Sequence, residues 1–205
     1  QVVQDISDSK KLVSDITGQK ILGYRAPYFS ILKENLHILD ILHDLEFTYD
    51  SSIMPVQMPR YGIHNFNTED QLYSLPGGGE IVELPLTVKK FGWRKWPVAG
   101  GGYIRLMPMP VLRNLYSNFF KNNTDCMIYM HPYEFDTEKL DIADNLKNHE
   151  NISAIKTLYL NFRWNFLRQS IRLKIDYLLK KYSFSTCKEK ANYVKITTHS
   201  PTILG

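Results

Sequence analysis

The first apolar pattern of the chain has helical spacing. Apolar side chains recur at roughly helical spacing among polar and charged residues in the stretch before Gly18, which predicts an amphipathic helix. Gly18 follows directly, in the place where a glycine commonly ends a helix. We therefore expect a helix that stops at Gly18. Its apolar positions are Val2, Val3, Ile6, Val13 and Ile16.

Strand-like and helix-like stretches then alternate along the chain. Residues 51–80 are rich in Pro, Gly, Asn and Ser and predict a long loop, and residues 93–108 are expected to be irregular. The strand-like runs are "KILGYRAP" (20–27), "FTYD" (47–50), "EIVELPLT" (80–87) and "CMIYMH" (126–131). The helical patterns are "ENLHILDILHDLE" (34–46) and "PVLRNLYSNFFKNN" (110–123).

This alternation predicts an α/β fold with a barrel-like sheet. In such sheets the functional side chains gather where the strands end. Polar side chains stand at three of the predicted strand ends, namely Arg25, Asp50 and His131. Histidine titrates near neutral pH, aspartate can orient a histidine, and arginine can keep a carboxylate ionised. Each residue taken singly is also compatible with an ordinary structural ion pair or hydrogen bond.

The C-terminal part differs from the body in pattern and in charge. Residues 1–146 carry 14 Lys and Arg against 18 Asp and Glu, whereas residues 147–195 carry 11 against 3. We therefore predict a body over 1–146 and a basic helical extension over 147–205, and no uniform nucleic-acid-binding surface. A helix or helix pair is expected over 152–182, with an apolar stripe that either packs on the body, which is favoured, or meets a membrane surface. The stripe is Trp164, Leu167, Ile171, Ile175, Leu178 and Tyr182.

Length and composition further narrow the classes of protein to which the chain can belong. A chain of 205 residues suits one domain, or one domain plus an appendage, and 43% hydrophobic with 22% charged residues is ordinary for a globular protein. Two cysteines are too few for a disulfide framework. We find no run of about 18 apolar residues and no signal peptide, which is compatible with a cytoplasmic or an envelope-associated protein.

Six motifs in one order resemble the polysaccharide deacetylase family, carbohydrate esterase family 4 with its NodB-homology domain. The resemblance covers residues 5–145 and is nearest to the bacterial exopolysaccharide-associated branch. It implies a partial deformed (β/α) barrel that lacks its first strands, and metal-dependent removal of N-acetyl groups from an amino-sugar polysaccharide. The motifs are "GYRAPYFSI", "YDSSIMP", "RYGI", "VELPLT", "PVAGGGYIRLMP" and "YMHPYEFD".

The resemblance also implies roles for single residues. Arg25 would pair with the catalytic-base aspartate, Pro27 would shape the turn, and the backbone N–H of Tyr28 would stabilise the oxyanion. Asp50 would orient His131, and His131 would protonate the leaving amine. The tryptophan that often follows the aspartate is absent, so packing of Ile53 or Met54 is expected in its place. Glu134 and Asp136 would tune His131 or cap the next turn, with the structural role favoured.

Two motifs of that family are absent from this sequence. The Thr-Phe-Asp-Asp run supplies the base and one metal ligand in the family, and a histidine pair supplies the others; His37 and His43 are six residues apart and do not imitate that pair. We therefore interpret the chain as the C-terminal portion of a deacetylase. A divalent metal, zinc first, is expected in the full-length family member but not on this chain, which alone is expected to be inactive.

Aromatic residues in the irregular segment suggest contact with sugar. Trp93 and Trp96 flank Arg94 and Lys95, and Tyr103 follows three glycines. Their rings could stack on sugars or pack under a loop. The alternative function is therefore a non-catalytic protein on the same fold, which binds glycan through these rings or a membrane surface through the basic extension.

Overall fold

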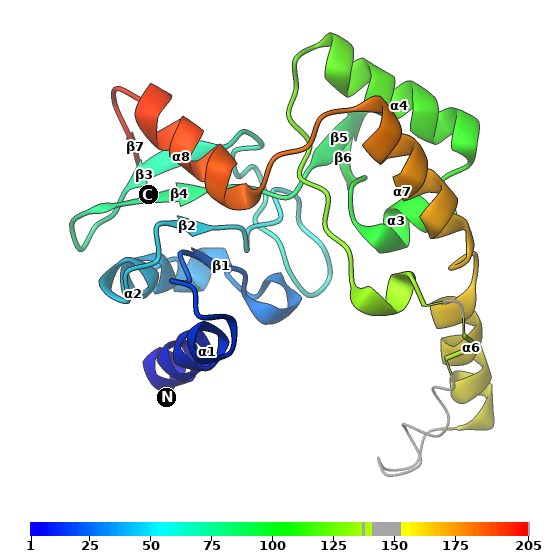
Figure 1. Ribbon diagram of the computed structural model, residues 1–205, viewed down its shortest axis with the longest axis horizontal. Helices are drawn as coiled ribbons and strands as arrows, with labels where there is room; N and C mark the ends of the chain where they lie inside the picture. The colour runs from blue at the N-terminus through cyan, green and yellow to red at the C-terminus, as the bar shows by residue number, and fades with distance from the viewer. Residues whose placement is uncertain (137, 141–152, 205) are drawn as a thin grey trace. The chain divides into compact units, whose positions relative to one another are not determined.

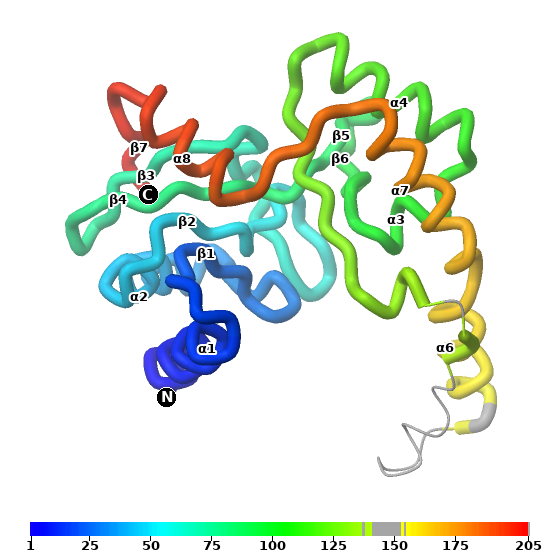
Figure 2. The backbone as a smooth tube through the Cα atoms, viewed as in Figure 1, coloured from blue at the N-terminus to red at the C-terminus, as the bar shows by residue number. Residues whose placement is uncertain are grey.

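The computed structural model describes residues 1–136, 138–140 and 153–204. Contacts divide the chain into two compact units. Unit 1 comprises Gln1–Pro97 and Phe184–Gly205, and unit 2 comprises Val98–Ser183. Figure 2 traces the chain as it leaves unit 1, passes through the green and yellow segments of unit 2, and returns to unit 1 in orange. The predicted division into a body over 1–146 and a basic helical extension over 147–205 stays a prediction.

Unit 1 is built on a five-stranded mixed sheet of order β1-β2-β4-β3-β7 (Figure 1). The pairs β1–β2 and β2–β4 are parallel, β3–β4 is antiparallel, and β3–β7 is parallel. The α/β prediction is confirmed. The predicted loop over 51–80 is wrong in part because β3 lies within it and pairs with β4. The strands are β1 (Gly23–Tyr24), β2 (Tyr49–Asp50), β3 (Gln71–Ser74), β4 (Glu80–Glu83) and β7 (Thr202–Ile203).

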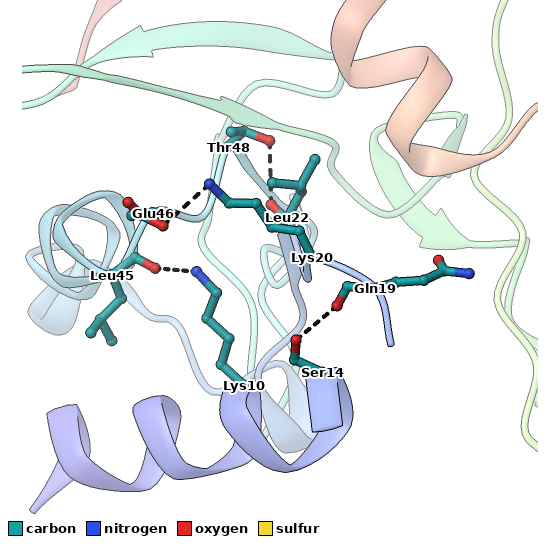
Figure 3. Close-up of polar contacts among 8 residues, drawn as sticks. All are labelled: Lys10, Ser14, Gln19, Lys20, Leu22, Leu45, Glu46 and Thr48. Atoms are coloured by element: carbon teal, nitrogen blue, oxygen red, sulfur yellow. Dashed lines mark hydrogen bonds and ion pairs between the residues drawn. The ribbon is translucent and has the colours of Figure 1, made fainter. Parts of the chain in front are cut away.

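The helix predicted over residues 2–17 is present as α1 (Val2–Thr17) and ends at Gly18, whose φ of 65° lies in the left-handed region. Ile6 is its one buried residue. Two lysines, Lys10 in the middle of α1 and Lys20 just after it, contact the residues that follow α2 (Ile38–Asp44), as Figure 3 shows. Lys10 donates to the carbonyl of Leu45 at 2.5 Å, and Lys20 lies 3.2 Å from Glu46.

The core of unit 1 lies where α2 meets the sheet. Leu39 and Leu42 of α2 are fully buried in one cluster with Phe47 of the following loop and Ile81 of β4. Full burial of such side chains stabilises a fold by about 1.5–3 kcal/mol each. Gly23 is required at the start of β1 because a Cβ there would lie 2.1 Å from the ring of Tyr49. This packing fixes the carboxyl ends of β1, β2 and β4.

A separate hairpin follows β4. It pairs β5 (Val88–Phe91) with β6 (Arg94–Pro97) in a two-stranded antiparallel sheet. In the register, Lys89 faces Trp96 and Phe91 faces Arg94. The C-terminal helix α8 (Cys187–Thr197) contacts β3 and β4 before the chain ends in β7.

Unit 2 is helical in its described residues. It contains α3 (Gly101–Leu106), α4 (Met109–Lys121), α6 (Ala154–Asn165) and α7 (Ser170–Lys181). The helix pair expected over 152–182 is confirmed as α6 and α7. Two other expectations are wrong: residues 93–108 contain β6 and α3, and "CMIYMH" forms only one bridge, between Tyr129 and Gly100.

The apolar stripe predicted for the extension divides between the two helices. On α7, Ile171 and Leu178 are buried in the core of unit 2, and Ile175 and Tyr182 pack against the same cluster. The favoured packing is therefore confirmed for α7. Trp164, which is 37% exposed, belongs to α6, whose outer side stays open. Within the described residues, none of the helices is long and apolar enough to cross a bilayer.

Candidate functional site

Three parallel strands of unit 1 end on one row of polar residues. Tyr24 of β1 pairs with Asp50 of β2, and Asp50 pairs with Glu83 of β4. Arg25 follows Tyr24 directly in the sequence. Because parallel strands present their carboxyl ends at the same edge, the row brings one cation and two carboxyl groups together. Tyr24 and Glu83 thus flank Asp50 on either side.

Asp50 is fully buried and its two oxygen atoms are held by one residue. The Ser52 hydroxyl donates to Oδ1 at 2.6 Å, and the Ser52 backbone N–H donates to Oδ2 at 2.9 Å. The same hydroxyl oxygen accepts the backbone N–H of Ala26 at 2.7 Å. Ser52 therefore fixes the Asp50 carboxyl and ties it to the turn that follows Arg25.

Glu83 is the second buried carboxyl of the row. Its Oε1 accepts the backbone N–H of Ile53 at 3.2 Å, and among the described residues its Oε2 has no donor. Burial and, after it, the charge of Asp50 raise the pKa of Glu83 well above 4.5. Burial also raises the pKa of Asp50, whereas hydrogen bonds from Glu83 and Ser52 oppose that rise. The charge of Asp50 adds to the effect of burial on Glu83, so we expect Glu83 to be the carboxyl of the pair that keeps its proton.

Arg25 is anchored beside this pair by Ser51. Its Nε donates to the Ser51 carbonyl at 2.8 Å, and a terminal nitrogen donates to the Ser51 hydroxyl at 2.7 Å. The Ser51 hydroxyl in turn donates to the carbonyl of Leu84 at 2.7 Å. The charge of Arg25 lowers the pKa of Glu83, against the larger effect of burial. The two hydrogen bonds to Ser51 therefore hold the guanidinium group beside the carboxyl pair, and both acceptors are neutral.

The turn after Arg25 has an unusual backbone. Tyr28 and Phe29 have φ values of 56° and 53°, in the left-handed region that non-glycine residues rarely occupy. Pro27 opens the 3₁₀ turn η1 (Pro27–Phe29), and the Phe29 N–H donates to the carbonyl of Ala26 at 3.1 Å. The Tyr28 side chain is 90% exposed. Left-handed conformations cost roughly 1–2 kcal/mol each, and such strain is concentrated at functional sites.

The hairpin β5–β6 displays the two tryptophans singled out in the sequence. Trp93 is 82% exposed and Trp96 is 50% exposed, so the reading in which they pack under a loop is wrong for Trp93. The Arg94 guanidinium lies 4.1 Å from the centre of the Trp93 ring, in a cation–π contact. One side of that ring is thereby occupied by a cation. Both tryptophans belong to unit 1, as do Pro27 and Tyr28.

His131 and Tyr103 belong to unit 2. His131 is exposed, and its ring stacks on Tyr133 with centroids 5.5 Å apart. Its backbone N–H donates to the buried Glu134 at 2.9 Å, which confirms the structural role favoured for Glu134. Tyr103 is half-buried on α3. The convergence of His131 with Arg25 and Asp50 stays a prediction.

The sequence interpretation missed what holds Arg25 and Asp50. Ser51 anchors Arg25, Ser52 holds Asp50, and the buried Glu83 is paired with Asp50 across the two parallel strands. A signal was present, because Glu83 is a lone charged residue in the apolar run "IVELPL". Ile53 and Met54 are both buried, as expected for residues that fill the place of a missing tryptophan.

The fit of this chain to a metal ion can be tested on its donor side chains. In the part of the chain that the structure describes, no three His, Cys, Asp or Glu side chains are grouped so that they could hold one. The oxygen atoms of Asp50 already accept two hydrogen bonds from Ser52. The donor side chains of the described residues therefore do not fit a metal centre.

Comparison with known proteins gives one match. Residues 51–192 match the family described as a domain of unknown function (DUF3473). The match spans more than half of the chain, so the chain belongs to that family. It begins at Ser51, the anchor of Arg25, and includes Glu83 and His131. No curated protein and no solved structure matches the chain.

Proposed function

We propose that this DUF3473 protein takes part in the hydrolysis of N-acetyl groups on an amino-sugar polysaccharide. The family is associated with polysaccharide deacetylases, which supports the proposal. The observation that carries it is the row of Arg25, Asp50 and Glu83 at the carboxyl ends of parallel strands. The resemblance assigns the first two of these residues to the site. The resemblance also implies that the mixed sheet is part of a partial deformed barrel of the NodB-homology type.

The strained turn suits the stabilisation of an oxyanion. Amide hydrolysis develops negative charge on the carbonyl oxygen, and a fixed backbone N–H aimed at that oxygen lowers the barrier. Tyr28 follows Pro27 in a turn fixed by Ser52 and Ala26, and its side chain points to solvent. In this proposal the Tyr28 N–H donates to the acetyl oxygen, and its left-handed φ holds it in place before substrate binds.

The buried pair supplies an ionised carboxylate of fixed orientation. With Glu83 protonated, Asp50 is the single negative charge of the pair and keeps acceptor capacity beyond its bonds to Ser52. An ionised aspartate can fix the tautomer and orientation of a histidine. In the proposal that histidine is His131, which donates a proton to the leaving amine.

The exposed hairpin favours contact with a glycan. Trp93 and Trp96 present apolar ring faces to solvent, and such faces can stack on sugar rings. The same observation supports the second candidate function, a glycan-binding protein without catalysis. The two functions differ in one measurable product, which is acetate.

The test is acetate release from N-acetylated chito-oligosaccharides by the natural gene product, with and without a chelator. His131→Ala and Asp50→Asn should each lower kcat by about 10²–10⁴-fold, the usual contribution of a proton-transfer residue. The exposed Asp44 of α2 gives the matched control Asp44→Asn, which should retain activity. Glycan binding without acetate release would favour the second function. Full activity of Asp50→Asn would exclude the assigned role of Asp50.

A further inference from the structure

The helix α6 turns its apolar side to solvent. Four of its large apolar residues, together with the residue that follows its end, recur three or four positions apart and form one stripe. Helices of globular proteins normally bury such a stripe. Phe162 and Phe166 touch each other, with ring centroids 4.9 Å apart. We call these residues the α6 stripe: Ile155 (82% exposed), Leu158 (72%), Tyr159 (57%), Phe162 (61%) and Phe166 (41%).

The C-terminal end of α6 is fixed to the rest of unit 2. Asn165 exchanges two hydrogen bonds of 2.9 Å with the backbone of Leu140, and the ring of Trp164 lies 5.0 Å from that of Tyr133. The buried Arg105 donates to the carbonyl groups of Arg163 and Trp164 at 2.9 and 3.0 Å. These contacts anchor the last turn of α6 and leave the side chains of the α6 stripe exposed.

Cations accompany the α6 stripe. Lys156 and Arg163 are seven residues apart, so they stand on one line along the helix, and both are exposed. Acidic residues are absent from Ser153–Asn165. The surrounding sequence, residues 147–195, has a net charge of +8. An apolar stripe with aromatic rings and flanking Lys and Arg is typical of a helix that lies in a membrane interface.

We propose that α6 docks on an anionic membrane surface. The stripe would enter the boundary between head groups and acyl chains, and Lys156 and Arg163 would remain at the level of the anionic head groups. Each cation near such a surface contributes an attraction that salt weakens. This inference does not depend on the proposed deacetylation, because α6 contains none of the residues assigned to that site.

A second copy of the chain is the less favoured occupant. A helix of 12 residues is about 18 Å long, so a stripe about 10 Å wide offers roughly 200 Å². A stable protein interface buries about 800 Å² on each partner. The positive charge of the flank also opposes self-association, because two stripes brought face to face would bring like charges together.

The experiment measures binding of the protein to vesicles by cosedimentation. Vesicles with about 30% phosphatidylglycerol in phosphatidylcholine should bind it, pure phosphatidylcholine vesicles should bind it much less, and added salt should weaken the binding. Lys156→Gln and Arg163→Gln should each lower the affinity about fivefold. Ile155→Glu and Phe162→Glu should each lower it at least about tenfold.

A matched control distinguishes binding through the α6 stripe from nonspecific binding through any exposed apolar side chain. Ile16 of α1 is also helical and 74% exposed, so Ile16→Glu makes the same chemical change in the acidic part of the chain. It should leave vesicle binding unchanged. Circular dichroism of each variant verifies that the fold is retained.

Four results would overturn the proposal. The first is equal binding to neutral and anionic vesicles, and the second is undiminished binding of Phe162→Glu. The third is a monomer–dimer equilibrium in sedimentation velocity that Phe162→Glu abolishes, with no binding to vesicles, which would identify a second copy as the occupant. A folded monomer that binds no vesicles would likewise reject the membrane.

Discussion

Replacing Glu83 by glutamine tests whether Glu83 keeps its proton in the folded protein. Glutamine has the shape of a protonated glutamate, and its amide can donate to Asp50 while its oxygen accepts the Ile53 N–H. The pKa of Glu83 lies well above 4.5 in the folded protein because of burial and the charge of Asp50. The folded protein therefore keeps a proton that the unfolded chain releases above pH 4.5.

The sign of the pH dependence follows from this difference. The contribution of Glu83 is fully present below pH 4.5 and is lost as pH rises toward the folded pKa, because unfolding then releases a proton. Each pH unit in that interval lowers the free energy of unfolding by up to about 1.4 kcal/mol. Between pH 5 and pH 7 the wild type should lose up to about 2.7 kcal/mol from this group. Glu83→Gln should not show this loss.

The assay is urea unfolding at pH 5, 6 and 7, followed by tryptophan fluorescence in a Trp164→Phe background. The remaining tryptophans, Trp93 and Trp96, then report on unit 1. The exposed Glu80, at the other end of β4, gives the control Glu80→Gln, which should run parallel to the wild type. If the free energies of unfolding of the wild type and of Glu83→Gln differ by the same amount at all three pH values, Glu83 does not keep its proton in the folded protein.

Three further substitutions test the fold around the sites. Tyr28→Gly should stabilise unit 1 by about 1 kcal/mol in thermal unfolding, because glycine adopts a positive φ without strain; a loss of stability would contradict the strain. Lys174→Met should destabilise unit 2 by roughly 1–3 kcal/mol, since the Lys174 ammonium donates to three oxygen atoms near the end of α3; a neutral effect would reject that role. Leu178→Ala should cost about 2–5 kcal/mol, whereas Leu179→Ala, at an exposed neighbour, should cost far less; equal losses would contradict the packing of α7.

The sequence was informative where local pattern decides the structure. The helix α1 and its glycine end follow from spacing and from the residue type that most readily adopts a left-handed φ. Arg25 and Asp50 could be placed at neighbouring strand ends because short apolar runs precede both. The pair α6 and α7 follows from the helical period of the extension.

Non-local contacts decided what the sequence did not reveal. The strand β3 forms because Leu72 and Tyr73 pair with β4. A segment rich in Pro and Gly gives no local indication of that pairing. The helix α3 begins with glycines because of close packing: a Cβ on Gly101 would lie 1.9 Å from the Glu134 carboxyl. Glycine disfavours helices in general, so these residues suggested an irregular segment.

The pairing of Asp50 with Glu83 is another long-range property. The two residues are 33 positions apart, and only the parallel pairing of β2 with β4 brings them together. The role of Ser52 could likewise not be predicted, because a serine after an aspartate is common in turns. Its importance lies in the bond that its hydroxyl accepts from Ala26.

A crystal structure of the natural gene product with bound acetate, the product of the proposed reaction, tests the central claim most directly. We expect an acetate oxygen within about 3 Å of the Tyr28 backbone nitrogen, and Asp50 within hydrogen-bond reach of a ring nitrogen of His131. Acetate bound elsewhere, or Asp50 and His131 more than about 6 Å apart, would contradict the proposed site.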